Sequence, residues 1–405
     1  GDFLILPLGT AGGNQESNLS SFSFSTTTAA STAWINFDAG NLFSGLTVAE
    51  PLLSPYINAS LNLKPEFNFL KVSTSCFANK EGSFLTFHSQ HAIKAYLLSH
   101  PHLDHIEGLA INSVDDLAPK YILGSNFTVT TIINNIFNWA GIVHSLSYVQ
   151  FSPSPPPATA WPNFGSEGTT PLLSTYQYTR LDLTSSAFVS IPNTPFAVRA
   201  FELSHSNPYK STAFLVYDAA SHAYFLYFGD TGAGKQVKID DMDLNIDVDQ
   251  VENSTDIATV WQAVAPLIDQ GSLWGIIIEC SYTNSVPNSL LFGHLKPSLL
   301  LNELDVLVSK LSAGNLYLPP VIISHIKPSA VLGINPATII SQEVAMNNTH
   351  NFNFVFPQQG ALLTITSSGI KVNPAPTTSQ AREFYPLLCT RTNGRLIGDS
   401  AKIKR

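Results

Sequence analysis

Four side chains that commonly bind metal ions lie within six consecutive residues of this 405-residue chain: His100, His102, Asp104 and His105. They follow an apolar run at residues 93–99 that we predict to be a strand. A sharp turn after a strand directs alternate side chains into one pocket. We therefore expect His100 and His102 to face one cation, and Asp104 and His105 a second. Because only 11 residues of the chain are His, this cluster indicates a metal site rather than a polar loop. Imidazole and carboxylate ligands suit zinc, manganese or iron.

A two-metal site needs further ligands, and three candidates each follow an apolar run that we predict to be a strand. These candidates are His205, Asp230 and His325. Taken singly, each is also consistent with a capping residue or with a buried, hydrogen-bonded polar group. Their common placement at strand ends, where a sheet edge presents side chains to a shared cleft, favours metal ligands for all three.

His294 stands apart from the remaining histidines. It follows Gly293 at the entry to a predicted helix, downstream of a strand that ends at Glu279. A histidine in such a place beside a metal cleft suits proton donation, and the alternative is a surface-loop histidine. The others have no such context, and we expect them to be structural or exposed: His88, His91, His144, His222 and His350.

Apolar runs and turn signals predict the elements that position these residues. Strands are expected at residues 3–8, 33–37, 93–99, 121–123, 128–131, 196–203, 213–217, 224–228, 273–279, 321–324, 352–356 and 361–366. Helices are expected at residues 256–269, 297–311 and 336–346, with one or two more within residues 41–75. This mixture of strands and helices predicts an α/β fold with two sheets packed face to face and helices outside, a four-layer αββα sandwich.

The same pattern predicts a single catalytic domain over residues 1–372. Residues 152–172 are rich in Pro, Ser and Gly, which is typical of a surface loop inserted into the domain. Residues 373–405 lack periodicity, and we expect them to form an extended C-terminal tail.

The charge of the chain argues against long nucleic acids as substrates. Charged residues make up 12% of the chain, its net charge is −9, and no Lys/Arg cluster stands out before the last residues. A DNA or RNA groove would need a basic stripe to neutralise phosphates. The oligomeric state cannot be read from the sequence, and a homodimer is one expectation.

Composition also bears on localisation. No apolar run reaches the roughly 20 residues of a membrane span. A low Lys content and a surface rich in Ser, Thr and Asn favour a secreted or periplasmic protein, with a cytoplasmic one as the alternative. Five Asn residues lie in N-x-S/T triplets, which carry little weight in so polar a chain: Asn18, Asn58, Asn126, Asn253 and Asn347. The three cysteines, Cys76, Cys280 and Cys389, are too few and too widely spaced for a disulfide framework, and we expect Cys280 to be a small buried apolar residue.

The motifs resemble a known family. Residues 100–105 read HxHxDH, the signature of the metallo-β-lactamase superfamily, and residues 100–113 are similar to the narrower signature of the class II cyclic-nucleotide phosphodiesterases. The first motif specifies only the superfamily, whereas the longer string is much more specific. Further matches occur in the same order at residues 9–13, 229–230, 275–281, 292–295, 301–304 and 323–325.

This resemblance implies a site with two divalent metal ions, expected to be Zn²⁺, with Asp230 bridging them. It implies His294 as the residue that protonates the leaving group, with Glu279 behind it. The implied substrate is a 3′,5′-cyclic nucleotide, cyclic AMP or cyclic GMP or both. A hydroxide held between the two cations would hydrolyse it to the nucleoside 5′-monophosphate.

Three other functions fit the same ligand cluster. An RNA phosphodiesterase of the RNase Z type would need a basic surface, which the charge of −9 argues against. A lactonase, thiolesterase or β-lactamase would act on carbon esters or amides, whereas the segments around Glu279 and His294 favour phosphodiester chemistry. A metal-stabilised binding protein would have no use for a spare proton donor.

Overall fold

The structure is a computed structural model. It describes residues 1–29, 33–58, 85, 88–113, 116, 120–137, 176–205, 209–234, 257–315 and 317–374. The predicted loop at residues 152–172 and all but the start of the predicted tail at residues 373–405 lie outside these ranges. No helix among the described residues is long and apolar enough to cross a membrane.

The first sheet has eight strands in the order β15-β14-β1-β2-β3-β4-β5-β6. They are β1 (Phe3–Gly9), β2 (Ser21–Thr26), β3 (Trp34–Phe37), β4 (Ile93–Leu98), β5 (Lys120–Ser125), β6 (Tyr176–Leu181), β14 (Leu362–Thr366) and β15 (Gly369–Asn373). Strands β3 to β6 pair in parallel, whereas the pairs from β15 through to β3 are antiparallel.

The second sheet has seven strands in the order β13-β12-β11-β10-β9-β8-β7. They are β7 (Val189–Ser190), β8 (Phe196–Ser204), β9 (Lys210–Asp218), β10 (Ala223–Phe228), β11 (Leu273–Glu279), β12 (Val321–Ser324) and β13 (Phe354–Val355). Strand β9 is antiparallel to both β8 and β10, and β10 is parallel to β11 and β12. Strands β8, β10, β11 and β12 therefore end at the same edge of the sheet.

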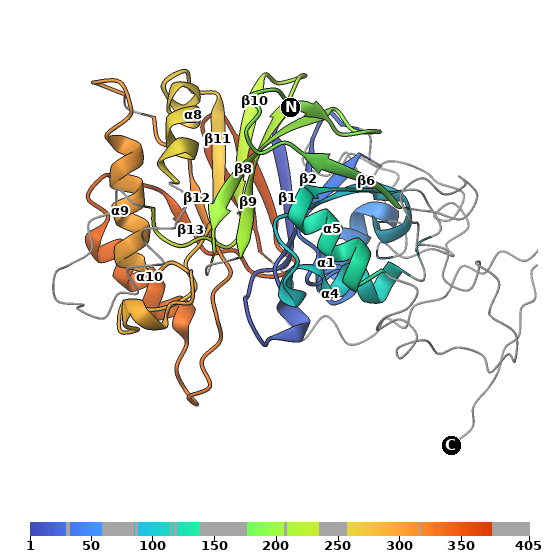
Figure 1. Ribbon diagram of the computed structural model, residues 1–405, viewed down its shortest axis with the longest axis horizontal. Coiled ribbons are helices and arrows are strands. Elements are labelled where there is room, and N and C mark those ends of the chain that lie inside the picture. Colours follow the sequence, from blue (N-terminus) through green and yellow to red (C-terminus); the bar gives the residue numbers. More distant parts are fainter. Residues whose placement is uncertain are drawn as a thin grey trace, which may run out of the picture.

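Helices cover the outer face of each sheet (Figure 1). On the first sheet lie α1 (Phe43–Asn58), α4 (Leu103–Asn112) and α5 (Asn126–Asn135), and on the second lie α8 (Ala258–Asp269), α9 (Pro297–Val308) and α10 (Pro336–Asn347). Short 3₁₀ turns occur at Glu16–Asn18 and Asn288–Leu290, and a π-helical turn at His88–Ala92. The sheets enclose an apolar layer rich in aromatic rings, among them Phe24, Phe37 and Phe225. This arrangement confirms the predicted αββα sandwich.

One predicted strand is wrong. Residues 128–131 lie in α5, because the Ser125 side chain accepts a hydrogen bond from the backbone N–H of Thr128 at 3.0 Å and caps a helix there. Val129 and Ile132 then bury one face of this helix. The predicted helix start at Asn335 is confirmed, since its side chain accepts from the N–H of Thr338.

Four strands were not predicted: β2, β6, β7 and β15. In β2 every second residue is Ser or Thr, which suggests a surface strand, yet all six residues are buried. Its polar side chains find partners inside the fold; Ser23, for example, contacts Nε2 of His88, in the π-helical turn, at 3.0 Å.

Candidate metal centre

Four of the predicted ligands gather around one point at the ends of strands from both sheets. His100 and His102 follow β4, His205 follows β8, and Asp230 follows β10. Their potential ligand atoms all lie within 4.8 Å of one another. Nδ1 of His102 is 3.3 Å from Nε2 of His205. Asp230 Oδ2 lies 3.6 Å from His100 Nε2 and 3.8 Å from His205 Nε2.

The other predicted ligands form an adjoining group of Asp104, His105 and His325. Nε2 of His325 is 3.1 Å from Nε2 of His105 and 3.2 Å from Oδ2 of Asp104. Asp230 Oδ2 lies 3.2 Å from His105 Nε2 and 3.3 Å from His325 Nε2. One carboxylate oxygen thus lies between the two groups, and the structure brings together all seven residues that the sequence singled out as ligands.

Four imidazole rings are held with Nδ1 facing outward, toward a hydrogen-bond acceptor. The pairs are His105 with the Asp38 carboxylate (2.8 Å), His100 with Ser99 Oγ (3.0 Å), His205 with the Gly293 carbonyl (3.1 Å) and His325 with Ser281 Oγ (3.0 Å). With the proton on Nδ1, the lone pair on Nε2 of each ring is directed into the cluster. This is the orientation that outer partners impose on metal-binding histidines.

The donor set fits metal ions. Two nitrogens bound to one tetrahedral zinc at 2.0–2.1 Å are about 3.3 Å apart, close to the His102–His205 and His105–His325 separations. His100 Nε2 is buried and has no hydrogen-bond partner among the described residues. A buried polar atom without a partner is costly, and a cation would satisfy it.

Asp38 is a part of the site that the sequence analysis missed. It follows β3, is fully buried, and has a positive φ of 52°. Besides His105, its carboxylate accepts hydrogen bonds from the backbone N–H and hydroxyl of Ser99 (2.7 and 2.8 Å) and from the Tyr227 hydroxyl (2.6 Å). It was recognisable in principle, because it is a polar residue at the end of an apolar run, like the ligands themselves.

Glycines allow the close approaches around the centre. A Cβ atom at Gly12 would overlap the His325 ring, and one at Gly229 would overlap the Ser99 side chain. The backbone N–H of Gly13 donates to Oδ2 of Asp104 at 2.9 Å. The glycine turn after β1 therefore supports the second group of ligands.

His294 and Glu279 form a buried pair beside the cluster. Nδ1 of His294 donates to Oε1 of Glu279 at 2.9 Å and lies 3.8 Å from Asp230 Oδ2. Glu279 also accepts from the N–H groups of Thr231 (2.8 Å) and Leu295 (3.3 Å). Because Nδ1 is engaged, Nε2 is the His294 atom left to act on a ligand in the pocket that this residue lines.

The electrostatics of the site favour ionised carboxylates. Burial raises the pKa of Asp230, but the imidazoles around it outweigh burial and hold that pKa well below its usual range. Burial lowers the pKa of His205 to about 4, which keeps this ring neutral. Burial also lowers the pKa of His294, yet Glu279 and Asp230 overcome it and raise the pKa above its usual value.

A pocket of about 430 Å³ opens onto the cluster. Leu103, Tyr209 and Phe292 line it together with His294 and four of the candidate ligands, and Lys327 is the only Lys or Arg in its described lining. The Lys327 ammonium lies 5.4 Å from the centre of the Tyr282 ring, which in turn packs edge-on against His294 at 5.9 Å. The sequence analysis missed Lys327, although it lies only two residues after His325.

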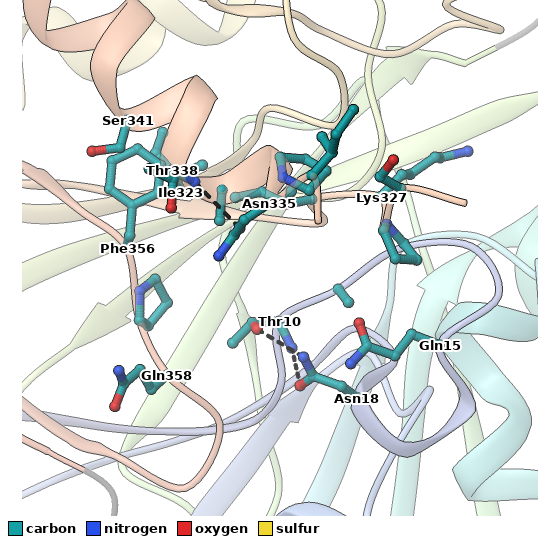
Figure 2. Close-up of a pocket in the computed structure, with 18 residues that line it drawn as sticks. Thr10, Gln15, Asn18, Ile323, Lys327, Asn335, Thr338, Ser341, Phe356 and Gln358 are labelled. Carbon is teal, nitrogen blue, oxygen red and sulfur yellow. Dashed lines mark hydrogen bonds between the residues drawn. The ribbon is translucent and has the colours of Figure 1, made fainter. Parts of the chain in front are cut away.

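A second hollow of about 740 Å³ adjoins the first, and Lys327 lines both (Figure 2). Neutral polar side chains such as Gln15, Asn335 and Gln358 face it, with Phe356 on one wall. In Figure 2 the Lys327 side chain lies at the edge of this hollow, with its nitrogen directed away from the other labelled residues.

Two facing sheets with outer helices, and a His/Asp cluster compatible with a metal site at their strand ends, define a protein of the metallo-β-lactamase fold. Its backbone superposes on the crystal structure of unliganded yeast PDE1 with a TM-score of 0.67 at 22% identity, covering 90% of this chain and 99% of that one.

A family model described as cAMP phosphodiesterases class-II matches residues 3–360. The chain therefore belongs to the class-II cAMP phosphodiesterases, which confirms the resemblance seen in its motifs. It is 35% identical over 360 residues to a 3′,5′-cyclic-nucleotide phosphodiesterase of Aliivibrio fischeri, covering 89% of this chain and 92% of the relative. A probable 3′,5′-cyclic-nucleotide phosphodiesterase of Yersinia pestis is 31% identical over 359 residues, with 88% of each chain covered.

Proposed function

We propose that this protein hydrolyses 3′,5′-cyclic nucleotides to nucleoside 5′-monophosphates at a centre of two zinc ions. Asp230 carries the proposal, because one of its oxygens lies 3.2–3.8 Å from nitrogens of His100, His105, His205 and His325. Such a placement suits a carboxylate shared by two cations. Family membership and the related phosphodiesterases support the substrate class.

In this proposal each cation has its own histidines. One would be held by His100, His102 and His205, and the other by Asp104, His105 and His325, with Asp230 common to both. A set dominated by imidazole with few carboxylates suits zinc better than magnesium or calcium, which prefer oxygen ligands.

When bound, two such cations would lower the pKa of a water molecule and neutralise charge on phosphate oxygens. The residues of the chain would supply the remaining parts. As the water oxygen joins phosphorus and the P–O3′ bond breaks, Nε2 of His294 would give its proton to O3′, so that the sugar leaves as a neutral hydroxyl. Glu279 would orient the His294 ring and stabilise its charged form, consistent with their 2.9 Å hydrogen bond. Lys327, which lines the same pocket, would attract the phosphate.

The test is turnover of cyclic AMP and cyclic GMP by purified protein, together with its metal content. We expect release of 5′-monophosphates, about two zinc ions per chain, and loss of turnover with a chelator that zinc restores. Metal-loaded protein that releases no monophosphate would refute the substrate. One metal ion per chain at full activity would refute the two-metal centre.

We also propose that the catalytic unit is the single domain of residues 1–372. The last strand, β15, ends at Asn373 and pairs with β14 at the edge of the first sheet. A chain ending at residue 374 should therefore keep the kcat of the full chain, and loss of turnover by a folded, metal-loaded truncation would contradict this.

We also propose that the protein is exported from the cytoplasm, on the basis of its amino-acid composition. Fractionation of cells that make the full-length protein tests it: activity in the medium or periplasm is expected, and activity confined to the cytoplasm would refute export.

A further inference from the structure

Large apolar side chains are exposed at the mouth of the metal pocket. Leu103 is 65% exposed, Phe292 59% and Tyr209 49%, and all three line this pocket. Leaving such side chains in water forgoes the stabilisation that their burial would contribute. Exposed apolar surface gathered beside a polar site indicates that a ligand covers it.

Backbone hydrogen bonds connect Tyr209, and Gly293 next to Phe292, to the same histidine of the candidate metal site, His205. The carbonyl of Tyr209 accepts from the N–H of His205 at 3.3 Å, and the Tyr209 ring packs edge-on against His102 at 5.5 Å. On the other side, the Gly293 carbonyl accepts from Nδ1 of His205 at 3.1 Å. Tyr209 and Phe292 are therefore presented from two loops that both bond to His205.

Phe292 is held in an unfavourable backbone conformation. Its φ is 52°, and Gly293 follows with φ 75°. A left-handed conformation is rare and unfavourable for a bulky residue, so it persists only where surrounding contacts impose it. In this conformation the Phe292 ring is 59% exposed and lines the metal pocket.

We propose that Tyr209 and Phe292 bind the nucleobase of the substrate by stacking against its faces. This inference rests on the proposed function and adds the position of the base to it. The phosphate would lie at the His/Asp cluster with Lys327 lining the same pocket, and the sugar would span the distance to the aromatic rings. A nucleobase has a polarisable face that stacks on aromatic rings. Exposed aromatic side chains beside a site for an anion therefore suit a nucleotide, whose base and phosphate need these two environments.

The adjoining hollow (Figure 2) is the competing place for the base, and three features disfavour it. Phe356, its aromatic residue, packs against the core of the second sheet. Asn18, one of its amides, is already bonded to the N–H and hydroxyl of Thr10. The Lys327 nitrogen is directed away from the other labelled residues of this hollow, and the same side chain also lines the metal pocket.

Steady-state kinetics of Phe292→Leu and Tyr209→Leu test the base position. Leucine keeps an apolar side chain and removes the aromatic face. With cyclic AMP we expect KM to rise about tenfold in each variant, the scale of one lost stacking contact, while kcat stays within about twofold. With the 3′,5′-cyclic phosphate of methyl riboside, which has no base, kcat/KM should not change. Tyr209→Phe keeps the aromatic face, so its KM for cyclic AMP should rise much less than that of Tyr209→Leu, and bound metal should be unchanged in all variants.

Phe356→Leu is the matched control, because it removes an aromatic ring from the other hollow. Raised KM for cyclic AMP in Phe356→Leu, with unchanged KM in the two pocket variants, would overturn the inference. So would an equal loss of kcat/KM on the substrate with a base and on the one without. If the wild type hydrolyses neither substrate, the proposed function is refuted together with the base position. If the wild type hydrolyses cyclic AMP and the two pocket variants have the same KM as the wild type, only the base position is refuted.

Discussion

The Asp38 carboxylate accepts a hydrogen bond from Nδ1 of His105 at 2.8 Å, and both side chains are buried. This contact fixes which His105 nitrogen faces the metal cluster. Asp38 touches no other predicted ligand, so its role is to position the ring rather than to bind a cation.

Asp38→Asn should therefore weaken metal binding without removing a ligand. An amide can present its NH₂ group to Nδ1, which disfavours the productive tautomer. We expect a loss of about 10–100-fold in metal affinity, measured by competition with a chelator, with a parallel loss of activity at limiting zinc. Asp218→Asn is the control, since Asp218 is equally buried but caps the turn after β9. Equal affinity in Asp38→Asn and the wild type would contradict the positioning role.

Asp230→Asn removes the charge between the two groups of ligands. We expect metal content to fall below two per chain and kcat/KM to drop by about 10²–10³-fold or more, the scale of losing one preorganised electrostatic group. Elemental analysis and turnover of the same sample check this. Two bound ions with full activity would exclude a bridging role for Asp230.

His294→Ala should keep both metal ions and lower kcat by about 10²–10⁴-fold, the usual contribution of a general acid. A phosphodiester with a p-nitrophenolate leaving group needs no proton, so the variant should lose much less activity on it. Glu279→Gln should give a smaller loss with the same dependence on the leaving group. A fall in metal content would instead make His294 a ligand, a role that its closeness to Asp230 and His325 also allows.

Lys327→Met keeps an unbranched apolar stem in the pocket and removes its charge. Because a hydrogen bond to a charged group contributes about 1.5–3 kcal/mol, kcat/KM for cyclic AMP should fall about tenfold or more. Inhibition by the 5′-monophosphate should weaken at least as much, since the product carries more negative charge. Lys327→Arg should retain most of the activity. Unchanged kinetics in Lys327→Met would place the ammonium away from the phosphate.

His88 predicts a pH dependence of stability outside the site. Burial, with a smaller contribution from Lys120, lowers its pKa from 6.5 to about 3. The unfolded chain therefore binds a proton below pH 6.5 that the folded chain does not. The stability due to neutral His88 is complete above this value and is lost as the pH falls from 6.5 toward 3, by up to about 1.4 kcal/mol per pH unit. Denaturant unfolding should show that the free energy of unfolding falls less steeply between pH 7 and 5 in His88→Gln than in the wild type. The same slope of this free energy against pH in both proteins would contradict the lowered pKa of His88.

The candidate ligands, which the structure brings together, were readable from the sequence because each is tied to a local signal. His100 and His102 lie in a short motif, and His205, Asp230 and His325 each follow a run that is apolar enough to be recognised as a buried strand. The layer order followed from the same runs, since buried strands and amphipathic helices have few ways to cover one another.

The side chains that orient those ligands were decided by the tertiary structure. Asp38 meets His105 across 67 positions, and Ser281 meets His325 across 44, because parallel neighbouring strands, β3 beside β4 and β11 beside β12, end at the same edge of their sheet. No local sequence pattern distinguishes a polar residue at a strand end that could bind a metal ion from one that orients such a ligand by a hydrogen bond. The same reason explains β2, whose alternating serines look exposed until Asn36 and His88 satisfy them inside the fold. Composition and spacing thus determined which chemistry this chain carries, whereas the packing of distant segments determined the direction in which each imidazole points.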